Sequence, residues 1–323
     1  MDRSGDDDKA RPRLKFAIAG AGGVGGYLGV RLAQAGHELA WLARGRTLAA
    51  LRERGILLES PSGEARLGPQ RASDDAAALA AAAGPVDAVI VAVKLYDLAA
   101  LAPRIAPLAG RRTRVLPLQN GVEAHAILSG ALPGSTVLKG TVSLKSFARA
   151  PGQVVCKSDF CKIRLGGDAG PEVDALVAAL NGCKAVSATF SPAIDLDLWS
   201  KFVLLASFSA VSCMARATIG EVLGNAGACR LLAEATEEAA AVGRALGVEL
   251  PQDIAALIDL HTREMPGAGR PSMLEDLEAG RPLELEFLSG AVVRLGAKLG
   301  VPTPVHAVAY KALLMHAHGG QPL

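Results

Sequence analysis

Near its start the chain contains the stretch Lys15-Phe16-Ala17-Ile18-Ala19-Gly20-Ala21-Gly22-Gly23-Val24-Gly25-Gly26. A short apolar run, typical of a strand, leads into the pattern G-x-G-x-x-G, and apolar residues at helical spacing follow. Gly20 allows a tight turn, Gly22 lets a pyrophosphate approach the backbone, and Gly25 lets the helix pack against the strand. Amides at the start of such a helix attract an anion. The stretch therefore predicts a dinucleotide-binding loop formed by Gly20, Ala21, Gly22, Gly23, Val24 and Gly25.

Strand and helix patterns alternate along the first half of the chain. The predicted strands are Leu14–Gly20, Glu38–Ala43, Val86–Val93 and Arg114–Gln119. The predicted helices are Val24–Ala35, Thr47–Arg54, Ala76–Ala83 and Leu98–Leu108. This alternation indicates a parallel, doubly wound α/β sheet of the Rossmann type. Two further segments are predicted to be β-hairpins, Leu57–Leu67 and Gly152–Leu165, the second with its turn at Lys157-Ser158-Asp159.

The pattern changes near Ser191, after which strand signals are few. Helical periodicity covers Ile194–Ala215, Asn225–Leu246, Pro251–Arg263, Leu285–Leu299 and Pro304–His316. We therefore predict three parts: a disordered tail (residues 1–13), a dinucleotide-binding Rossmann domain (14–190) and an all-α C-terminal domain (191–323) for substrate binding and dimerisation.

Composition narrows the class of partner. The 323 residues include 34 basic and 32 acidic side chains, a net charge of +2, so no overall field attracts nucleic acid or an anionic membrane. The longest apolar run, Phe202–Ala215, is too short to span a bilayer and is predicted to be a buried helix. Five cysteines without C-x-x-C pairing predict reduced thiols and no metal site. A polar, acidic start in place of a signal peptide predicts a cytoplasmic protein.

The end of the second predicted strand bears on the type of cofactor. It reads Leu42-Ala43-Arg44-Gly45-Arg46, about twenty residues after the glycine loop. NAD sites usually carry Asp or Glu here for the ribose hydroxyls, whereas an arginine accommodates the 2′-phosphate of NADP. Arg44 therefore favours NADPH over NADH, although an ordinary solvated surface arginine is the alternative.

Polar residues also follow two neighbouring predicted strands. Lys94 comes directly after Val86–Val93, and Asn120 comes directly after Arg114–Gln119. Ligands of open α/β sheets bind at the carboxyl ends of the strands. A lysine extending to solvent and an ordinary Asx turn are the alternatives, but two such residues beside a cofactor loop favour a site.

Lys201 is the most unusual residue of the second half, because it lies in an otherwise apolar helix. Leu205 and Ser209 lie on the same helix face. Burial lowers the pKa of an ammonium group toward values that suit a general acid. Pairing with Asp195 or Asp197 at the helix start would instead give the lysine a structural role.

Two further residues have ordinary explanations at helix ends. Pro282 suits a first helical turn, where the nearby Glu284 complements the helix dipole. Ser272 suits an N-cap, with Glu275 completing a capping box. Spacing alone gives neither Glu284 nor Ser272 a role in chemistry.

Together these pieces resemble the ketopantoate reductase (2-dehydropantoate 2-reductase) family over nearly all of the chain after the tail. The resemblance is carried by the glycine loop, Arg44, Val93-Lys94, Gln119-Asn120-Gly121-Val122-Glu123, Leu198-Trp199-Ser200-Lys201, Ser272-Met273-Leu274-Glu275-Asp276 and Glu284-Leu285-Glu286-Phe287-Leu288-Ser289-Gly290. It implies a homodimer that reduces a 2-oxo acid with NADPH. The implied reaction converts 2-dehydropantoate to pantoate in pantothenate biosynthesis.

The resemblance also implies a role for each matching residue. Lys201 matches the family's general acid, and Glu284 matches its acidic residue at the interdomain cleft, beside the cofactor. The remaining matches are the cofactor-side Lys94 and Asn120, Arg44 for the 2′-phosphate, and Ser272 for the substrate carboxylate.

The resemblance is incomplete in the substrate pocket. Relatives carry asparagines one and two helical turns beyond the catalytic lysine, where this chain has Leu205 and Ser209, and a third asparagine is Ile219 here. Loss of groups that hydrogen-bond a substrate hydroxyl changes discrimination by orders of magnitude. A D-2-hydroxyacid dehydrogenase with a more apolar side-chain pocket is therefore one alternative. A non-catalytic NADP-binding protein is another.

Overall fold

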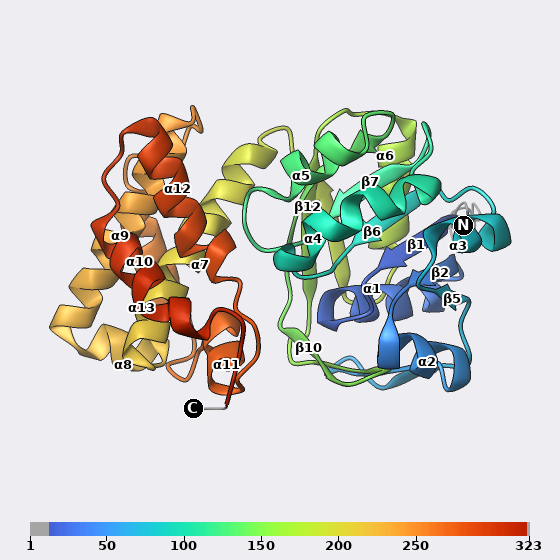
Figure 1. The fold of residues 1–323 in the computed structure, drawn as a ribbon, viewed down its shortest axis with the longest axis horizontal. Coiled ribbons are helices and arrows are strands. Elements are labelled where there is room, and N and C mark those ends of the chain that lie inside the picture. Colours follow the sequence, from blue (N-terminus) through green and yellow to red (C-terminus); the bar gives the residue numbers. More distant parts are fainter. Residues whose placement is uncertain (1–12, 322–323) are drawn as a thin grey trace, which may run out of the picture. The chain divides into compact units, whose positions relative to one another are not determined.

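A computed structural model describes residues 13–321. The chain divides into two compact units, and each is described by itself (Figure 1). Unit 1 contains the described residues up to Val93, together with Asp97–Gln119 and Ala124–Ile194. Unit 2 contains Lys94–Tyr96, Asn120–Glu123 and the residues from Asp195 onward. The predicted tail, residues 1–13, lies outside the described residues except for Arg13.

The main sheet of unit 1 confirms the predicted doubly wound arrangement. Its six parallel strands are, in spatial order, β5 (Ala72–Ser73), β2 (Glu38–Leu42), β1 (Lys15–Ala19), β6 (Ala88–Val91), β7 (Arg114–Pro117) and β8 (Thr136–Val137). Strands β2 and β5 extend the sheet on one side of β1, and strands β6, β7 and β8 extend it on the other side. The carboxyl ends of β1 and β6 therefore form the switch point at which this class of sheet binds ligands.

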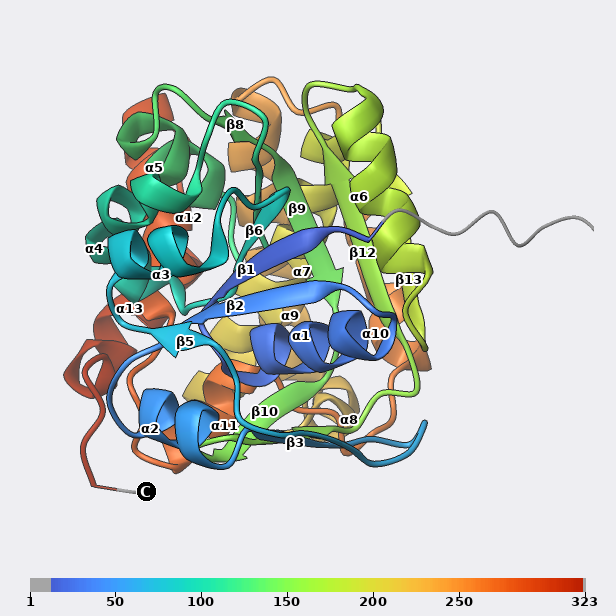
Figure 2. The same ribbon diagram turned by 90° about the vertical axis from the view of Figure 1, so that its right-hand side faces the viewer.

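Helices alternate with strands along the first half of the chain. They are α1 (Gly23–Gln34), α2 (Gly45–Glu53), α3 (Ala76–Ala83), α4 (Leu95–Leu101), the 3₁₀ helix η1 (Ala102–Leu108), α5 (Ala124–Ala131) and α6 (Pro171–Asn181). Figure 2 shows α1 lying along the six-stranded sheet. Gly29 faces the Trp41 ring of β2, and Gly26 faces Val154 and Ile56 of a second sheet. The two glycines thus let α1 fit between the sheets.

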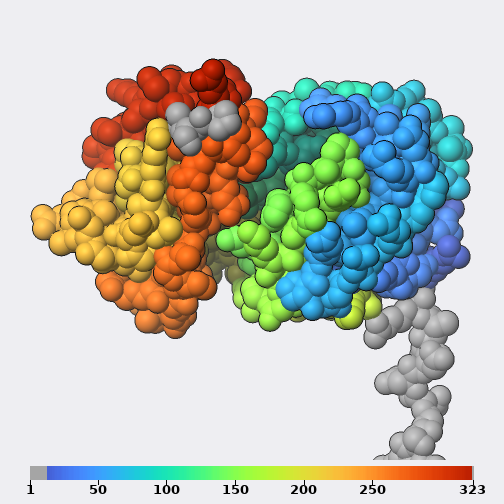
Figure 3. Space-filling view, turned by 90° about the horizontal axis from the view of Figure 1, so that it is seen from below, coloured from blue at the N-terminus to red at the C-terminus, as the bar shows by residue number. Residues whose placement is uncertain are grey.

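Two smaller sheets complete unit 1. The four-stranded one has the order β10 (Ser146–Ala150), β11 (Gln153–Cys156), β3 (Ile56–Glu59) and β4 (Ala65–Leu67). The antiparallel pair β3 and β4 confirms the predicted hairpin Leu57–Leu67. Figure 3 shows the green residues of β10 and β11 beside the blue residues of β3 and β4 on the surface. The three-stranded sheet has the order β13 (Val186–Phe190), β12 (Cys161–Gly166) and β9 (Lys139–Ser143).

The second predicted hairpin, Gly152–Leu165, is wrong. Its two strands exist as β11 and β12, but they belong to different sheets. β11 forms its hairpin with the preceding strand β10, and Ala150 pairs with Gln153 across Pro151-Gly152. Gly152 has a φ of +74°, a conformation that glycine adopts without strain. The Pro-Gly turn therefore decides the pairing rather than Lys157-Ser158-Asp159.

Unit 2 is built from helices. They are α7 (Ile194–Ala215), α8 (Ile219–Gly224), α9 (Ala226–Ala245), α10 (Ile254–Glu264), α11 (Ser272–Glu278), the 3₁₀ helix η2 (Leu285–Phe287), α12 (Ser289–Leu299), α13 (Pro304–Leu313) and the 3₁₀ helix η3 (Leu314–His316). The predicted helix Leu285–Leu299 is interrupted at Leu288, where ψ of −97° separates η2 from α12. The short helix α8 has no counterpart among the predicted elements.

Helix α7 is the core helix of unit 2. Trp199, Phe202 and Val203 are buried in a cluster with residues of α9, α11 and α12. With 22 residues, α7 is longer than the apolar run Phe202–Ala215 and is long and apolar enough to cross a membrane by length and composition. Length and composition alone do not distinguish a core helix from a membrane span. Because 61% of the most apolar window of α7 is buried inside the protein, we interpret α7 as a core helix.

His306 ties three helices of unit 2 together. Its ring is fully buried, with Nε2 3.0 Å from the Ala235 carbonyl oxygen on α9 and Nδ1 3.2 Å from the Ser289 hydroxyl on α12. A carbonyl oxygen only accepts, so Nε2 carries the proton and Nδ1 accepts from Ser289. The neutral imidazole therefore has both hydrogen bonds satisfied, and burial lowers the pKa of His306 from 6.5 to about 4.

Acid is expected to destabilise the protein through His306. Between pH 6.5 and about 4 the unfolded chain takes up a proton that the folded protein cannot, so stability falls as the pH falls through this range, by up to about 3 kcal/mol. Buried Glu238, whose pKa burial raises, titrates in the opposite sense. Urea denaturation of the wild type and His306→Gln from pH 7 to 4 isolates the effect, because the variant should lose stability less steeply. Parallel pH profiles would assign the acid sensitivity to other groups.

Candidate functional site

The glycine loop forms a tight turn between β1 and α1. Gly20 has a φ of +100°, and a Cβ at this position would lie 2.8 Å from the Val93 side chain. A Cβ on Gly25 would lie 1.9 Å from the carbonyl oxygen of Gly20, so only glycine lets the helix approach the strand this closely. The predicted roles of Gly20 as the turn and Gly25 as the packing contact agree with these distances.

Gly22 is the N-cap of α1, and it leaves space in front of the helix. No side chain caps the first turn, and a Cβ on Gly22 would meet no protein atom within 4 Å. The first amides of a helix lack partners within the helix and carry partial positive charge. Open space, free amides and the switch point between β1 and β6 together fit the pyrophosphate of a dinucleotide.

Arg44 lies on the same edge of the main sheet. It is the N-cap residue of α2, two residues after the end of β2, and its side chain is 70% exposed. Its Nη2 donates to Oδ1 of Asp97, on the first turn of α4, at 2.6 Å. A guanidinium at this position fits a 2′-phosphate, but here it already has a carboxylate partner.

Unit 2 contains a cluster of charged groups that come from distant parts of the chain. The Lys94 ammonium donates to Oε2 of Glu284 at 2.7 Å and to Oδ2 of Asp276, on α11, at 3.2 Å. Glu284 and Asp276 are buried, with only 4% and 8% of each residue exposed. The other oxygen of Asp276 accepts from Arg281 at 2.7 Å. Asp276 thus links two cations and fixes Lys94 against Glu284.

The charge of Lys94 is held firmly by these contacts. Burial alone would lower the pKa of Lys94, but the Glu284 and Asp276 carboxylates outweigh it and raise this pKa above the usual range. A lysine so held keeps its proton throughout the physiological pH range. Lys94 is therefore suited to holding Glu284 in place and not to donating a proton.

Lys201 and Asn120 form a second polar contact in unit 2. The half-buried Lys201 ammonium, on α7, donates to Oδ1 of Asn120 at 3.1 Å. Asn120 is a neutral acceptor, unlike the two carboxylates that hold Lys94. Two residues that the sequence placed at neighbouring strand ends, Lys94 and Asn120, therefore contact Glu284 and Lys201 respectively.

The other predicted substrate residues differ in their exposure. Ser272 is exposed, and Leu205 is half-buried one turn beyond Lys201. Ser209 is 2% exposed, and Ile219 is fully buried among apolar side chains that include Phe208 and Val222. Of Leu205, Ser209 and Ile219, only Leu205 thus keeps appreciable exposure.

The structure also tests the helix-end explanations that the sequence offered for Ser272 and Glu284. Pro271, not Ser272, is the N-cap of α11, and no side chain caps that helix, so the predicted capping box is wrong. Glu284 is the N-cap residue of the three-residue helix η2, so it lies at a helix start as predicted, but that helix is short because the chain breaks at Leu288. The Asp276 and Asp97 contacts were not predicted. A lysine at a buried strand end needs a carboxylate partner, but nothing in the sequence says which one.

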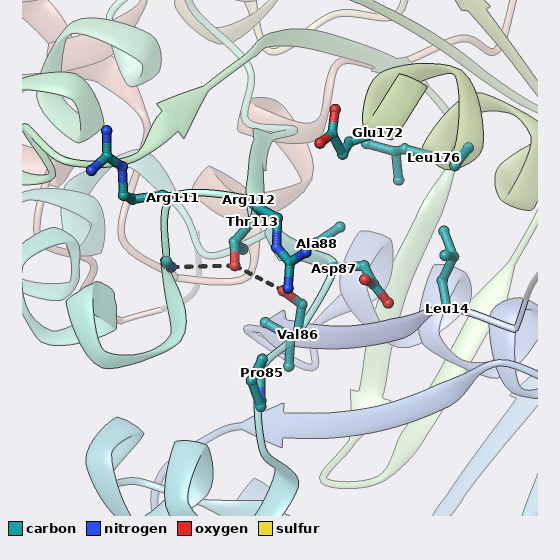
Figure 4. A pocket seen from close by; sticks show the side chains of 12 residues that line it. Leu14, Pro85, Val86, Asp87, Ala88, Arg111, Arg112, Thr113, Glu172 and Leu176 are labelled. Carbon is teal, nitrogen blue, oxygen red and sulfur yellow. Dashed lines mark hydrogen bonds between the residues drawn. The ribbon is translucent and has the colours of Figure 1, made fainter. Parts of the chain in front are cut away.

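A separate pocket of about 490 Å³ lies at the opposite edge of the main sheet (Figure 4). It is lined by residues at the amino ends of the strands, including Leu14, Asp87 and Thr113. Thr113 donates to the Val86 carbonyl oxygen at 2.8 Å and accepts from the Gly110 amide at 3.2 Å. The pocket is therefore distinct from the glycine loop. Within residues 13–321, no group of three or more His, Cys, Asp and Glu side chains could hold a metal ion.

The turn at Gly20, the open space before α1 and the buried lysine–carboxylate cluster are features expected of a dinucleotide-binding enzyme. Residues 16–166 match the family model "Ketopantoate reductase PanE/ApbA", and residues 193–317 match "Ketopantoate reductase PanE/ApbA C terminal". The chain belongs to the ketopantoate reductase PanE/ApbA family. It is thus an oxidoreductase of a family that reduces 2-oxo acids.

The chain is similar over most of its length to proteins with different descriptions. A 2-dehydropantoate 2-reductase of Mesorhizobium japonicum is 31% identical over 319 residues, covering 90% of this chain and 94% of the relative. The uncharacterized oxidoreductase YkpB of Bacillus subtilis is 28% identical, covering 94% and 99%. The crystal structure of a PanE/ApbA family ketopantoate reductase from Ralstonia eutropha has a TM-score of 0.85 and 30% identity, covering 94% and 98%.

Two more distant structures share the fold. D-mandelate dehydrogenase, solved with NADH and anilino(oxo)acetate, has a TM-score of 0.83 and 24% identity, covering 94% of this chain and 98% of that one. A dimeric ketopantoate reductase from Staphylococcus aureus has a TM-score of 0.80 and 19% identity, covering 94% and 99%. The same fold is therefore shared by a D-mandelate dehydrogenase that was solved with NADH.

Proposed function

We propose that this protein uses NADPH to reduce a 2-oxo acid to a 2-hydroxy acid, with 2-dehydropantoate as substrate and pantoate as product. The observation that carries the proposal is the polar cluster of unit 2. Lys201 donates to Asn120, and Lys94 donates to the buried Glu284, so two lysines, an amide and a buried carboxylate gather in unit 2. Buried charges are costly, and charged groups of this kind cluster at functional sites, which supports a catalytic role for this one. The match to 2-dehydropantoate 2-reductases supports the substrate.

The residues of the cluster take different roles in this reaction. When bound, the reduced nicotinamide supplies the hydride that reaches the substrate carbonyl carbon. The Lys201 ammonium stabilises the alkoxide oxygen that forms and then protonates it. Asn120 orients the ammonium through the contact at 3.1 Å. Glu284 orients a substrate hydroxyl, and the exposed Ser272 binds the substrate carboxylate.

A D-2-hydroxyacid dehydrogenase with an apolar side-chain pocket is the second candidate function. Leu205 favours it, because this half-buried aliphatic side chain lies one helical turn from Lys201. The likeness of fold to D-mandelate dehydrogenase is compatible with it. An aliphatic side chain there would accept a bulky apolar substituent and would give no hydrogen bond to the hydroxyl of 2-dehydropantoate.

We also propose that the protein acts as a cytoplasmic homodimer. Unit 2 exposes large apolar side chains on α10, α13 and the 3₁₀ helix η3, namely Leu257, Leu260, Val308 and Met315. Exposed apolar groups of this kind are found at protein–protein contacts. The family likeness to a dimeric reductase supports the same assembly.

An assay across substrates tests the proposed function. NADPH consumption is measured with 2-dehydropantoate and with 2-oxo acids that carry bulky aliphatic or aromatic side chains. We expect kcat/KM for 2-dehydropantoate to exceed that for the aromatic acids by about tenfold or more. A reversed order would establish the second candidate. NADPH binding without oxidation by any of these acids would instead indicate a non-catalytic binding protein.

A further inference from the structure

The Arg44–Asp97 ion pair lies where the adenosine end of the cofactor is expected. Arg44 lies two residues after the end of β2, and Asp97 lies on the first turn of α4, which follows β6. In the sheet, β2 and β6 are the two neighbours of β1, whose carboxyl end carries the glycine loop. Ribose hydroxyls or a 2′-phosphate bind at the end of the second strand in this kind of site. All of these elements and both residues belong to unit 1.

This pair combines two recognition chemistries in one place. NAD sites usually place a carboxylate at the end of the second strand, and the stretch Leu42-Ala43-Arg44-Gly45-Arg46 has none. Asp97 brings a carboxylate to the same guanidinium from α4, 53 residues further along the chain. A carboxylate accepts a hydrogen bond from a ribose 2′-hydroxyl, whereas a guanidinium binds a 2′-phosphate.

The two chemistries oppose each other when the phosphate is present. A 2′-phosphate bound by Arg44 must displace Asp97 or accept its charge within a few Å. Exposed ion pairs are weak, so displacement is possible, but like charges that close repel even in water. The carboxylate therefore weakens the binding of NADPH and leaves the binding of NADH intact.

We propose that Asp97 determines cofactor preference, reducing the advantage that Arg44 gives to NADPH so that the protein binds both nicotinamide cofactors. The proposal rests on the proposed function only in placing the dinucleotide at the glycine loop. It requires no reduction of a 2-oxo acid. Asp97 acts through its charge, so its amide counterpart keeps the shape of the side chain and removes the effect.

Binding titrations without substrate test the proposal. The Kd values of NADPH and NADH are measured by the fluorescence of the reduced nicotinamide for wild type and Asp97→Asn. We expect Asp97→Asn to bind NADPH about tenfold more tightly, equivalent to about 1.4 kcal/mol. The Kd of NADH should stay the same or rise. The gain for NADPH should shrink in 1 M salt, because exposed charges are screened there.

Two control variants show whether a change in Kd is specific to Asp97. Asp259→Asn removes a carboxylate paired with Arg263 at 2.8 Å on α10, and it should change neither Kd. Gly22→Ala fills the open space before α1 and should weaken both cofactors alike. An unchanged NADPH-to-NADH ratio in Asp97→Asn would overturn the proposal, as would a wild type that binds neither cofactor. If both bind as expected but no 2-oxo acid is reduced, the proposed function fails and this inference stands.

Discussion

Replacement of Lys201 by alanine is expected to lower kcat by about 10³- to 10⁴-fold while the Kd of NADPH stays within about twofold of wild type. The reason is that the substrate oxygen becomes negatively charged only during the reaction. The substrate carbonyl is neutral before reduction, whereas the alkoxide that forms is fully charged. An ammonium beside that oxygen is therefore worth most in the transition state, and its loss appears in kcat.

The local structure should survive this substitution. Lys201 is half-buried on α7, and the neighbouring Phe202 and Val203 supply the apolar contacts of the helix. Alanine is the best helix former, so α7 loses no helical propensity. Asn120 loses a donor but is itself half-buried, and water can replace the lost hydrogen bond.

A matched lysine on the same unit serves as control. Lys298→Ala removes an exposed ammonium from the last turn of α12 and should leave kcat unchanged. Stopped-flow traces at saturating NADPH and 2-oxo acid give the turnover of all three proteins, and thermal melts report their folding. Wild-type turnover in folded Lys201→Ala would remove the lysine from the mechanism and with it the proposed reductase chemistry.

The fold was predictable where its signals are local. The glycine loop, the apolar strands and most periodic helices carry their pattern within about a dozen residues, and the structure has them near the predicted bounds. Two helices differ: the predicted Leu98–Leu108 is divided between α4 (Leu95–Leu101) and η1, and the predicted Leu285–Leu299 is interrupted at Leu288. Strand partners are not local. β11 pairs with β3, whose residues lie about a hundred positions earlier, and no pattern in Gln153–Cys156 specifies that partner. The wrong hairpin follows from this difference.

In the candidate site too, local features were predictable from the sequence and distant partners were not. Lys94 and Asn120 were predicted because strand ends are recognisable in the sequence, and Lys201 because a lysine in an apolar helix is unusual. Asp276 and Asp97 have no such mark, since each is a single carboxylate on a short helix with no sequence pattern that names its partner. Their partners lie 182 and 53 residues away. Which carboxylate meets which cation is decided by packing, which only the structure shows.

Glu284→Gln is expected to lower kcat by about 10²- to 10³-fold, because a neutral amide cannot carry the charge that Lys94 holds in place. Glutamine has nearly the shape of glutamate and still accepts one hydrogen bond. Lys94 keeps Asp276 at 3.2 Å, so the ammonium retains a carboxylate partner and the unit should fold. The measurement is kcat and KM for the preferred 2-oxo acid, together with a thermal melt.

Glu286 supplies the matched control two residues away. Its side chain is 49% exposed and contacts Arg294 and the Tyr310 hydroxyl, whereas the Glu284 side chain is 5% exposed. Glu286→Gln loses a carboxylate from the same segment and should change kcat less than about twofold, as exposed ion pairs contribute little. Equal losses in the two variants would trace the effect of Glu284→Gln to disturbance of the segment rather than to its buried carboxylate.

A double variant separates two ways in which Glu284 can act. If its carboxylate contacts the substrate independently of Lys94, the losses caused by Glu284→Gln and Lys94→Gln should multiply. If Lys94 acts by holding Glu284 in place, the second substitution should cost little once the first is made, because residues that work as a unit are not additive. The 2.7 Å contact and the raised pKa of Lys94 favour the second outcome. Multiplying losses would therefore contradict a positioning role for Lys94.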